Sequence, residues 1–355
     1  MRKYSILMLG ASYGSLLASK LLLGGHSAHL ICLPAEADLI NKNGARVRMP
    51  VKGRQGLVEV DTQKLAGKLS AGGPAGVDPA AYDLVCLGMQ EPQYRSPGVR
   101  ELMDRIARSK VPCMSIMNMP PLTYLARIPG LSLASLEPCY ADASVWKAFD
   151  PTTMTLCSPD PQAFRPPEEP VNVLQVSLPT NFKAARFVSD AHTAILHQLQ
   201  SDIESARFDA GDGPIELPVK LKVHESIFVP LAKWAMLLTG NYRCVGKDGM
   251  RSIKEAVHTD VSTSREVYNW VMALCRSLGA SADDLVPFEK YAAAANGLIR
   301  PSSAARALAA GAQNIERVDM LVRNIAAQKG LKNPIVEETV ALVDGWLARN
   351  RAKTA

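Results

Sequence analysis

Lys233 is the residue whose surroundings point most clearly to chemistry. It lies in the run from Ile227 to Gly240, in which no other residue is charged. A lysine removed from water is pushed toward its neutral form, or is held charged by a bound anion. Either state suits carbonyl chemistry, as a proton donor or as a cation that polarises the oxygen. The alternative is a lysine whose stem lies on apolar surface and whose ammonium stays in water.

Asn241 follows Lys233 on what we predict to be the same helix, over residues 224–241. The two residues are eight positions apart, which places them about 80° apart on a helical wheel. We therefore expect the amide of Asn241 to share a face with the ammonium of Lys233.

A glycine-containing turn, Gly10-Ala-Ser-Tyr-Gly-Ser, follows the first apolar run of the chain. A dinucleotide fold needs glycine here, because the backbone must approach the pyrophosphate and the helix N-terminus must offer it free N–H groups. Compared with the spacing G-x-G-x-x-G, Ser12 replaces the second glycine and Gly14 comes one residue early. The turn predicts a dinucleotide site at Gly10, Ser12, Tyr13 and Gly14. A Rossmann-like unit that holds no dinucleotide is the alternative.

The end of the second predicted strand leaves the nicotinamide cofactor undecided. An acid at this tip binds the ribose hydroxyls of NAD, whereas an arginine binds the 2′-phosphate of NADP. Neither residue stands at the tip itself, which is Leu33. Glu36 is placed to reach a ribose, and the cations that follow are placed to meet a phosphate: Lys42, Arg46 and Arg48.

Alternating strands and helices must position these residues. Apolar runs predict buried parallel strands at 4–10, 28–33, 84–88 and 111–117, with further strands at 46–50 and 57–61. Helices are predicted at 15–23, ending at Gly24-Gly25, and at 36–43, 95–110 and 188–205. Residues 67–83 are predicted to form a loop, and 150–190 to form strands interrupted at 165–170. This order is typical of an α/β fold with a parallel Rossmann-like sheet and helices on both faces.

The second half of the chain is predicted to be all-helical. Its helices are expected at 224–241, 260–279, 284–297, 302–329 and 335–350. We therefore predict a dinucleotide-binding domain over residues 1–215 and a helical substrate and dimerisation domain over 216–355, with the boundary in Asp209 to Pro218. Long helices often pack across a two-fold axis, so a homodimer is expected.

Composition excludes several classes of protein. The 355 residues carry a formal charge of +6 without a basic stripe interleaved with aromatic residues, which argues against nucleic-acid binding. The seven cysteines form no CxxC pair and no cluster with histidine, so neither a metal site nor a disulfide framework is expected. No apolar stretch is long enough for a membrane span or a signal peptide, which predicts a cytoplasmic protein.

The histidines do not form a catalytic arrangement with serine or cysteine in the sequence. His26 follows Gly25 at a predicted helix end and is expected to be a cap or turn residue. His192 and His197 are expected on a surface helix.

Over most of its length the chain resembles the ketopantoate reductase (2-dehydropantoate 2-reductase) family. Five segments carry the resemblance: the helix from Gly14 to His26, the strand Asp83–Leu87, the strand end Ile116–Met119, the segment around Lys233, and Pro301-Ser-Ser with the helix after it. Members of that family reduce a 2-oxo acid with a hydride from NADPH, in a cleft between a Rossmann domain and a helical domain.

The resemblance implies roles for four residues. Lys233 would donate a proton to the nascent alkoxide or hold it. Asn118 and Asn241 would orient the hydroxyl and carbonyl groups of the substrate, with Asn118 also near the nicotinamide. Ser302 would bind the substrate carboxylate.

The sequence departs from the family pattern at several positions. Leu237 stands where the family has a second asparagine, and Asn314 where it has a substrate-binding acid. Gln90 replaces a cofactor-facing lysine, Leu33 replaces the NADP-binding arginine, and the glycine turn is one residue shorter. Lost buried hydrogen bonds of about 1–3 kcal/mol each would change the pocket, so a 2-oxo acid other than ketopantoate, or an imine, is expected.

The sequence thus predicts an NAD(P)H-dependent reductase of a small 2-oxo acid, with NADP the expected cofactor and NAD the alternative. Lys233 and Asn118 are its catalytic candidates, and Asn241, Ser302 and Asn314 its substrate-binding candidates. The cofactor-binding candidates are Gly10, Ser12, Tyr13, Gly14, Gln90 and Asn118. An opine- or imine-type dehydrogenase and a non-catalytic Rossmann-fold binding protein are the alternatives.

Overall fold

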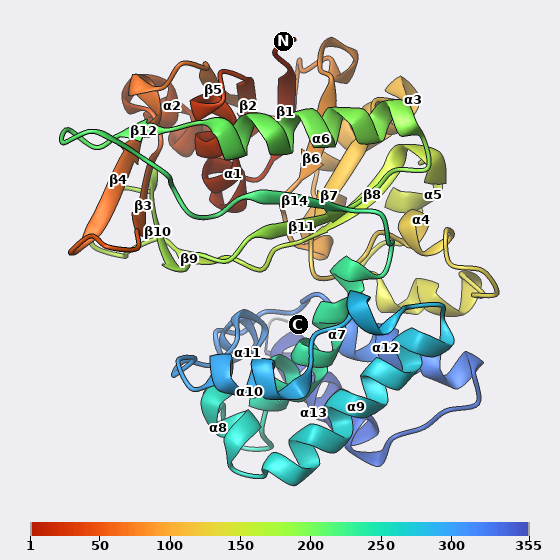
Figure 1. Cartoon of the computed structure of the whole chain (residues 1–355). Coiled ribbons are helices and arrows are strands. Elements are labelled where there is room, and N and C mark those ends of the chain that lie inside the picture. Colours follow the sequence, from red (N-terminus) through yellow and green to blue (C-terminus); the bar gives the residue numbers. More distant parts are fainter. Residues whose placement is uncertain (1, 354–355) are drawn as a thin grey trace. The chain divides into compact units, whose positions relative to one another are not determined.

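The structure, a computed structural model, describes residues 2–353 and divides into two compact units, each considered by itself (Figure 1). The sheet unit comprises the chain up to Met89, Gln93–Tyr124 and Val145–Ile227. The helical unit comprises Gln90–Pro92, Leu125–Ser144 and the chain from Phe228 onward. The α/β class predicted from the sequence, a Rossmann-like parallel sheet followed by an all-helical region, is confirmed.

An eight-stranded sheet in the order β14-β11-β8-β7-β6-β1-β2-β5 forms the centre of the sheet unit. All neighbouring pairs are parallel except β8 with β11. The strands are β1 Ser5–Leu9, β2 Ser27–Ile31, β5 Leu69–Gly72, β6 Leu84–Leu87, β7 Cys113–Ile116, β8 Met154–Ser158, β11 Phe182–Ala185 and β14 Leu221–His224. Its helices are α1 Ala11–Leu23, α2 Pro34–Asn43, α3 Val99–Ser109 and α6 Asp190–Ser205, with short α4 Leu122–Leu125 and α5 Ser144–Lys147 at the borders of the unit.

A second, four-stranded sheet in the order β4-β3-β10-β9 belongs to the same unit. Its strands are β3 Arg46–Pro50, β4 Leu57–Asp61, β9 Gln162–Phe164 and β10 Val173–Leu178, and a small hairpin pairs β12 Phe208–Asp209 with β13 Pro214–Ile215. The strands predicted at 46–50 and 57–61 are therefore confirmed.

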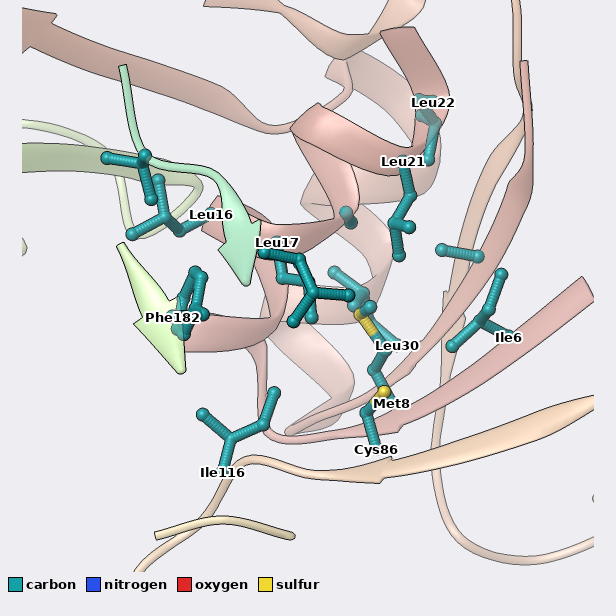
Figure 2. Packing of buried hydrophobic residues seen from close by; sticks show 14 of the residues in the cluster. Ile6, Met8, Leu16, Leu17, Leu21, Leu22, Leu30, Cys86, Ile116 and Phe182 are labelled. Atoms are coloured by element: carbon teal, nitrogen blue, oxygen red, sulfur yellow. The ribbon is translucent and has the colours of Figure 1, made fainter. Parts of the chain in front are cut away.

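The central strands are covered on both faces, as continuous apolar runs of a parallel sheet require. Ile6, Met8 and Leu30 of β1 and β2 meet Leu16, Leu17 and Leu21 of α1 in one cluster, which Figure 2 shows from close by. Each of these side chains is buried and contributes about 1.5–3 kcal/mol relative to exposure. This packing fixes where α1 begins, directly after β1.

The end of α1 is set by its two glycines, as the sequence predicted. Gly25 has φ +84°, and its N–H donates to Leu22 O at 2.9 Å while His26 N–H donates to Leu21 O at 3.0 Å. These two bonds form a Schellman motif, which needs a left-handed residue after the helix.

The helical unit is built from helices connected by short irregular segments. Its α-helices are α7 Lys233–Met236, α8 Ile253–His258, α9 Val261–Ser277, α10 Phe288–Ala295, α11 Ser303–Ala309, α12 Val318–Gln328 and α13 Pro334–Ala352. Within residues 2–353 we find no helix with both the length and the apolar character that a membrane span requires.

Three predictions of secondary structure and the predicted domain boundary differ from the structure. Part of the expected loop at 67–83 is β5, a short edge strand paired through its backbone to β2. The chain enters the helical unit at Phe228 rather than at 216, because β14 pairs with β11 in the large sheet. The helix expected at 224–241 is short and composite, and the helix expected at 302–329 is broken by an irregular segment at 310–317.

His26 takes part in the Schellman motif at the end of α1, as expected for a cap or turn residue, and its side chain is fully buried. Its Nδ1 accepts the N–H of Tyr4 at 3.1 Å, so the proton of the neutral ring lies on Nε2, 3.0 Å from Asp202 Oδ2. Lys3 Nζ lies 3.2 Å from the same carboxylate. Burial lowers the pKa of His26, and the attraction of Asp202 opposes this only in part. The contact joins β1 and the end of α1 to α6.

The free energy of unfolding is expected to fall as the pH drops through the unfolded-state pKa of histidine, about 6.5. The folded pKa of His26 is lowered, so the unfolded chain binds the proton more readily and the stabilisation exists only above that pH. Denaturant unfolding at a series of pH values, compared with His26→Gln, measures this contribution. The same pH dependence in His26→Gln as in the wild type would contradict it, while His197→Gln, at a half-exposed position of α6, serves as the control.

Candidate active site

The order of the strands places a ligand crevice beside β1. From β1 the chain adds β2 and β5 on one side and then crosses over to add β6, β7 and β8 on the other. In open parallel sheets, ligands bind outside the carboxyl ends of the strands at such a switch point. In this chain the switch point lies between the turn at Gly10 and the turn at Gly88.

Gly10 and Gly88 bring these two turns into backbone contact. Gly10 N–H donates to Ile31 O at 2.9 Å, and Gly88 N–H donates to Leu9 O at 2.8 Å. Gly10 has φ +98°, and a Cβ there would lie 2.7 Å from Met89 Cγ and 2.9 Å from Gly88 O. Only glycine fits this position without strain.

The N-terminus of α1 opens onto this crevice with its backbone amides uncapped. No side chain caps the helix, and its first turn has no acidic residue. The first N–H groups and the helix dipole therefore favour an anion, which is the requirement of a pyrophosphate. The residues present at the turn fit a dinucleotide despite the altered glycine spacing.

The other residues of the turn have distinct positions. Gly14 faces the sheet, where a Cβ would lie 3.2 Å from Leu30 Cδ2, so this glycine allows α1 to pack closely on β2. Ser12 and Tyr13 are half-buried, and the hydroxyl of Tyr13 donates to Pro161 O at 3.0 Å. Tyr13 thereby holds the connection between β8 and β9 against the turn.

Asn118 lies two residues beyond β7, on the same edge of the sheet. Its Oδ1 is buried and accepts no hydrogen bond within residues 2–353. An unsatisfied buried polar atom costs about 1–3 kcal/mol, so this oxygen marks a place where a ligand donor is missing. Gln90 is exposed and lies two residues beyond Gly88.

The expected ribose and phosphate contacts at the end of β2 are corrected. Leu33 at the tip is 75% exposed. Glu36 is buried and forms an ion pair with Arg165, a residue that the sequence analysis missed because it lies 129 positions away. Arg48 is bound in β3 by Glu59 and Glu169.

In the helical unit, Lys233 is the first residue of α7, and it is half-buried rather than buried. A 3-10 turn, Val229–Ala232, precedes it, and a π turn, Leu237–Asn241, follows. The helical wheel that related Lys233 to Asn241 assumed an unbroken α-helix and does not apply. Single π turns are frequent at functional sites, which is an independent reason to look for chemistry here.

Ser302 and Asn241 are brought together by a hydrogen bond. Ser302 is 3% exposed, and its hydroxyl donates to Asn241 O at 2.6 Å. The hydroxyl oxygen of Ser302 also accepts the N–H of Ala305 at 3.1 Å, which makes Ser302 the N-cap of α11. Ser302 therefore anchors the end of the π turn to the start of α11.

Asn314 lies in the irregular segment between α11 and α12, not on a helix. Two residues further on, Glu316 is 9% exposed and accepts the N–H of Glu91 at 3.3 Å. Glu91 is 3% exposed and accepts the N–H of Ala141. Counting along a presumed helix led to Asn314 and missed these two buried carboxylates, because the break in the helix changes which residues turn inward. Across the described residues 2–353, His, Cys, Asp and Glu side chains do not gather in threes that could hold a metal ion.

Comparison with known proteins places this geometry in a described fold. No protein-family model matches the sequence, and no curated protein matches it significantly. A 2-dehydropantoate 2-reductase from Methylococcus capsulatus superposes with a TM-score of 0.64 at 14% identity, over 98% of this chain and 97% of that one. D-mandelate dehydrogenase in complex with NADH and anilino(oxo)acetate gives 0.63 at 14% identity, over 98% and 99%.

This chain has the ketopantoate reductase fold. A dimeric ketopantoate reductase from Staphylococcus aureus gives a TM-score of 0.60 at 8% identity, with 98% of this chain and 99% of that one covered. The resemblance predicted from the sequence is thus confirmed at the level of the fold, over nearly the whole chain.

Gly10→Ala is expected to lower the free energy of unfolding by roughly 2–4 kcal/mol, through a strained φ and overlap with the Gly88 turn. Gly53→Ala is the matched control, because Gly53 also has a positive φ but nothing within 4 Å of its added Cβ. It should cost only about 1 kcal/mol. Urea unfolding of both variants measures the difference, and equal losses would show that the two turns are not in tight contact.

Ser302→Ala is expected to lower the free energy of unfolding by about 1–3 kcal/mol, since it removes a helix cap and a buried hydrogen bond. Ser303→Ala, at the exposed next position, should change it by less than about 0.5 kcal/mol. Thermal and urea unfolding test the pair. Unchanged stability in Ser302→Ala would contradict the anchoring role.

Proposed function

We propose that this protein is a nicotinamide-dependent reductase that converts a small 2-oxo acid to the 2-hydroxy acid. The observation that carries the proposal is the uncapped start of α1 at the switch point of the sheet. Gly10 and Gly88 have no side chains, so only backbone atoms line the turns there. The fold supports it, because proteins of this fold include 2-dehydropantoate 2-reductases and a D-mandelate dehydrogenase with NADH bound.

The residues of the sheet unit would hold the cofactor. The N–H groups at the start of α1 would bind the pyrophosphate beside Gly10, Ser12, Tyr13 and Gly14. Asn118, with its unsatisfied Oδ1, would accept a hydrogen bond from the nicotinamide amide or from a substrate hydroxyl. NADP is the proposed cofactor and NAD the alternative.

The residues of the helical unit would act on the substrate. Reduced nicotinamide, when bound, supplies the hydride that adds to the carbonyl carbon. The ammonium of Lys233 would hydrogen-bond the carbonyl oxygen and give it a proton as the alkoxide forms, which yields the 2-hydroxy acid. Asn241, held at the end of the π turn by Ser302, would orient the substrate.

The substrate proposed is a 2-oxo acid other than ketopantoate, because Leu237 and Asn314 replace polar groups of the family pattern. The ternary structure of D-mandelate dehydrogenase with NADH and anilino(oxo)acetate, a protein of the same fold, supports a substrate other than ketopantoate. A homodimer in a reducing cytoplasmic setting is part of the proposal, in keeping with the dimeric structural neighbour and with seven cysteines that form no disulfide within residues 2–353.

Calorimetric titration of the full-length protein with NADPH and with NADH is the deciding measurement. We expect micromolar binding of at least one, since the uncapped α1 terminus and Gly10 suit a pyrophosphate. Absence of binding at millimolar concentration would exclude the reductase. Binding without turnover of any 2-oxo acid, alone or with an amine, would leave a non-catalytic dinucleotide-binding protein.

Lys233→Ala is expected to lower kcat by about 10²–10⁴-fold on the substrate found, because the general acid is lost, and to leave cofactor affinity unchanged. Lys254→Ala, an exposed lysine of α8 in the same unit, is the control and should retain full activity. Oxidation of the reduced nicotinamide, followed by absorbance, measures kcat. A kcat within twofold of wild type in Lys233→Ala would remove this residue from the reaction.

A further inference from the structure

An arginine from a distant part of the chain lies near the end of β2. Arg165 follows β9 and forms an ion pair with Glu36 in the first turn of α2. The two residues are 129 positions apart and belong to the same sheet unit. The folded chain thus supplies at this tip a cation that β2 itself lacks.

Arg165 is the accessible member of the pair. Its side chain is 33% exposed, whereas that of Glu36 is 9% exposed. A guanidinium carries five N–H donors, and the contact with Glu36 uses one edge of the group. The remaining donors suit bidentate binding of a phosphate, which a lysine cannot provide.

The thiol beside the pair adds no negative charge. Burial and the neighbouring carboxylate of Glu36 raise the pKa of the Cys32 thiol to about 12, so it is neutral. Helix α2 begins beside it without a side-chain cap, which adds the positive end of a helix dipole. Leu33, 75% exposed, offers apolar surface beside this positive region.

The end of the second strand meets the ribose of the adenosine half in a dinucleotide fold. We propose that Arg165 binds the 2′-phosphate of NADP, anchored by Glu36, and that this residue rather than one on β2 sets the cofactor preference. This inference rests on the proposed function. It distinguishes Arg165 from the other cations near this region, since Arg48 is already bound by two carboxylates.

The test is calorimetric titration of full-length wild type and Arg165→Ala with NADPH, NADH and 2′,5′-ADP. We expect Arg165→Ala to weaken NADPH and 2′,5′-ADP by about tenfold or more, the loss of one charge-assisted contact, and to leave NADH within about twofold. Arg48→Ala is the matched control and should change none of the three. Arg165→Lys, which keeps the charge and loses the fork, should give an intermediate loss and replaces Arg165→Ala if circular dichroism shows that variant unfolded.

The outcomes separate this inference from the proposed function. Wild-type protein that binds neither NADPH nor NADH overturns both. Wild-type protein that binds only NADH, or an unchanged ratio of NADPH to NADH affinity in the folded Arg165 variant, overturns this inference alone. If Glu36→Gln lost NADH affinity tenfold while its NADPH affinity stayed unchanged, the Glu36 carboxylate would be the residue that binds the cofactor at the end of β2. That result would also overturn the inference about Arg165.

Discussion

The backbone contact between the turns after β1 and β6 is the constraint on which the sheet unit depends. Gly10 and Gly88 approach so closely that a single Cβ at Gly10 would overlap the neighbouring turn. Strands β2 and β5 lie on one side of β1, and β6, β7 and β8 lie on the other. Because the contact joins the turns after the paired strands β1 and β6, it lies at this switch point. The start of α1 and the end of β2 adjoin this contact.

The helical unit contains an irregular helical segment that contacts from other elements hold in place. The π turn Leu237–Asn241 departs from α-helical hydrogen bonding, so its end needs an external partner. Ser302 supplies one by donating to Asn241 O while capping α11. The family resemblance implies that Ser302 binds the substrate, and the structure shows a positioning contact with Asn241.

Local patterns in the sequence predicted the elements whose signals lie within a few residues. The apolar run of β1, the glycine turn and the Gly24-Gly25 end of α1 each depend on neighbours in the chain, and each is found in the structure. The edge strand β5 and the break between α11 and α12 were not predicted. The four-residue strand β5 is stabilised by its pairing to β2, which no local pattern indicates. The residues 310–317 have a helical sequence pattern, and only packing against other elements makes the segment irregular.

By itself the sequence determined the fold class and the position of the glycine turn after β1, and it singled out Lys233 as a candidate, because apolar periodicity, glycine and an isolated charge are local signals. Only the tertiary structure decided that His26 is buried against Asp202, that Glu316 turns inward, and that Arg165 stands at the end of β2. These facts join residues far apart in the chain. Their energies come from desolvation and paired charges, which exist only after the segments have packed together.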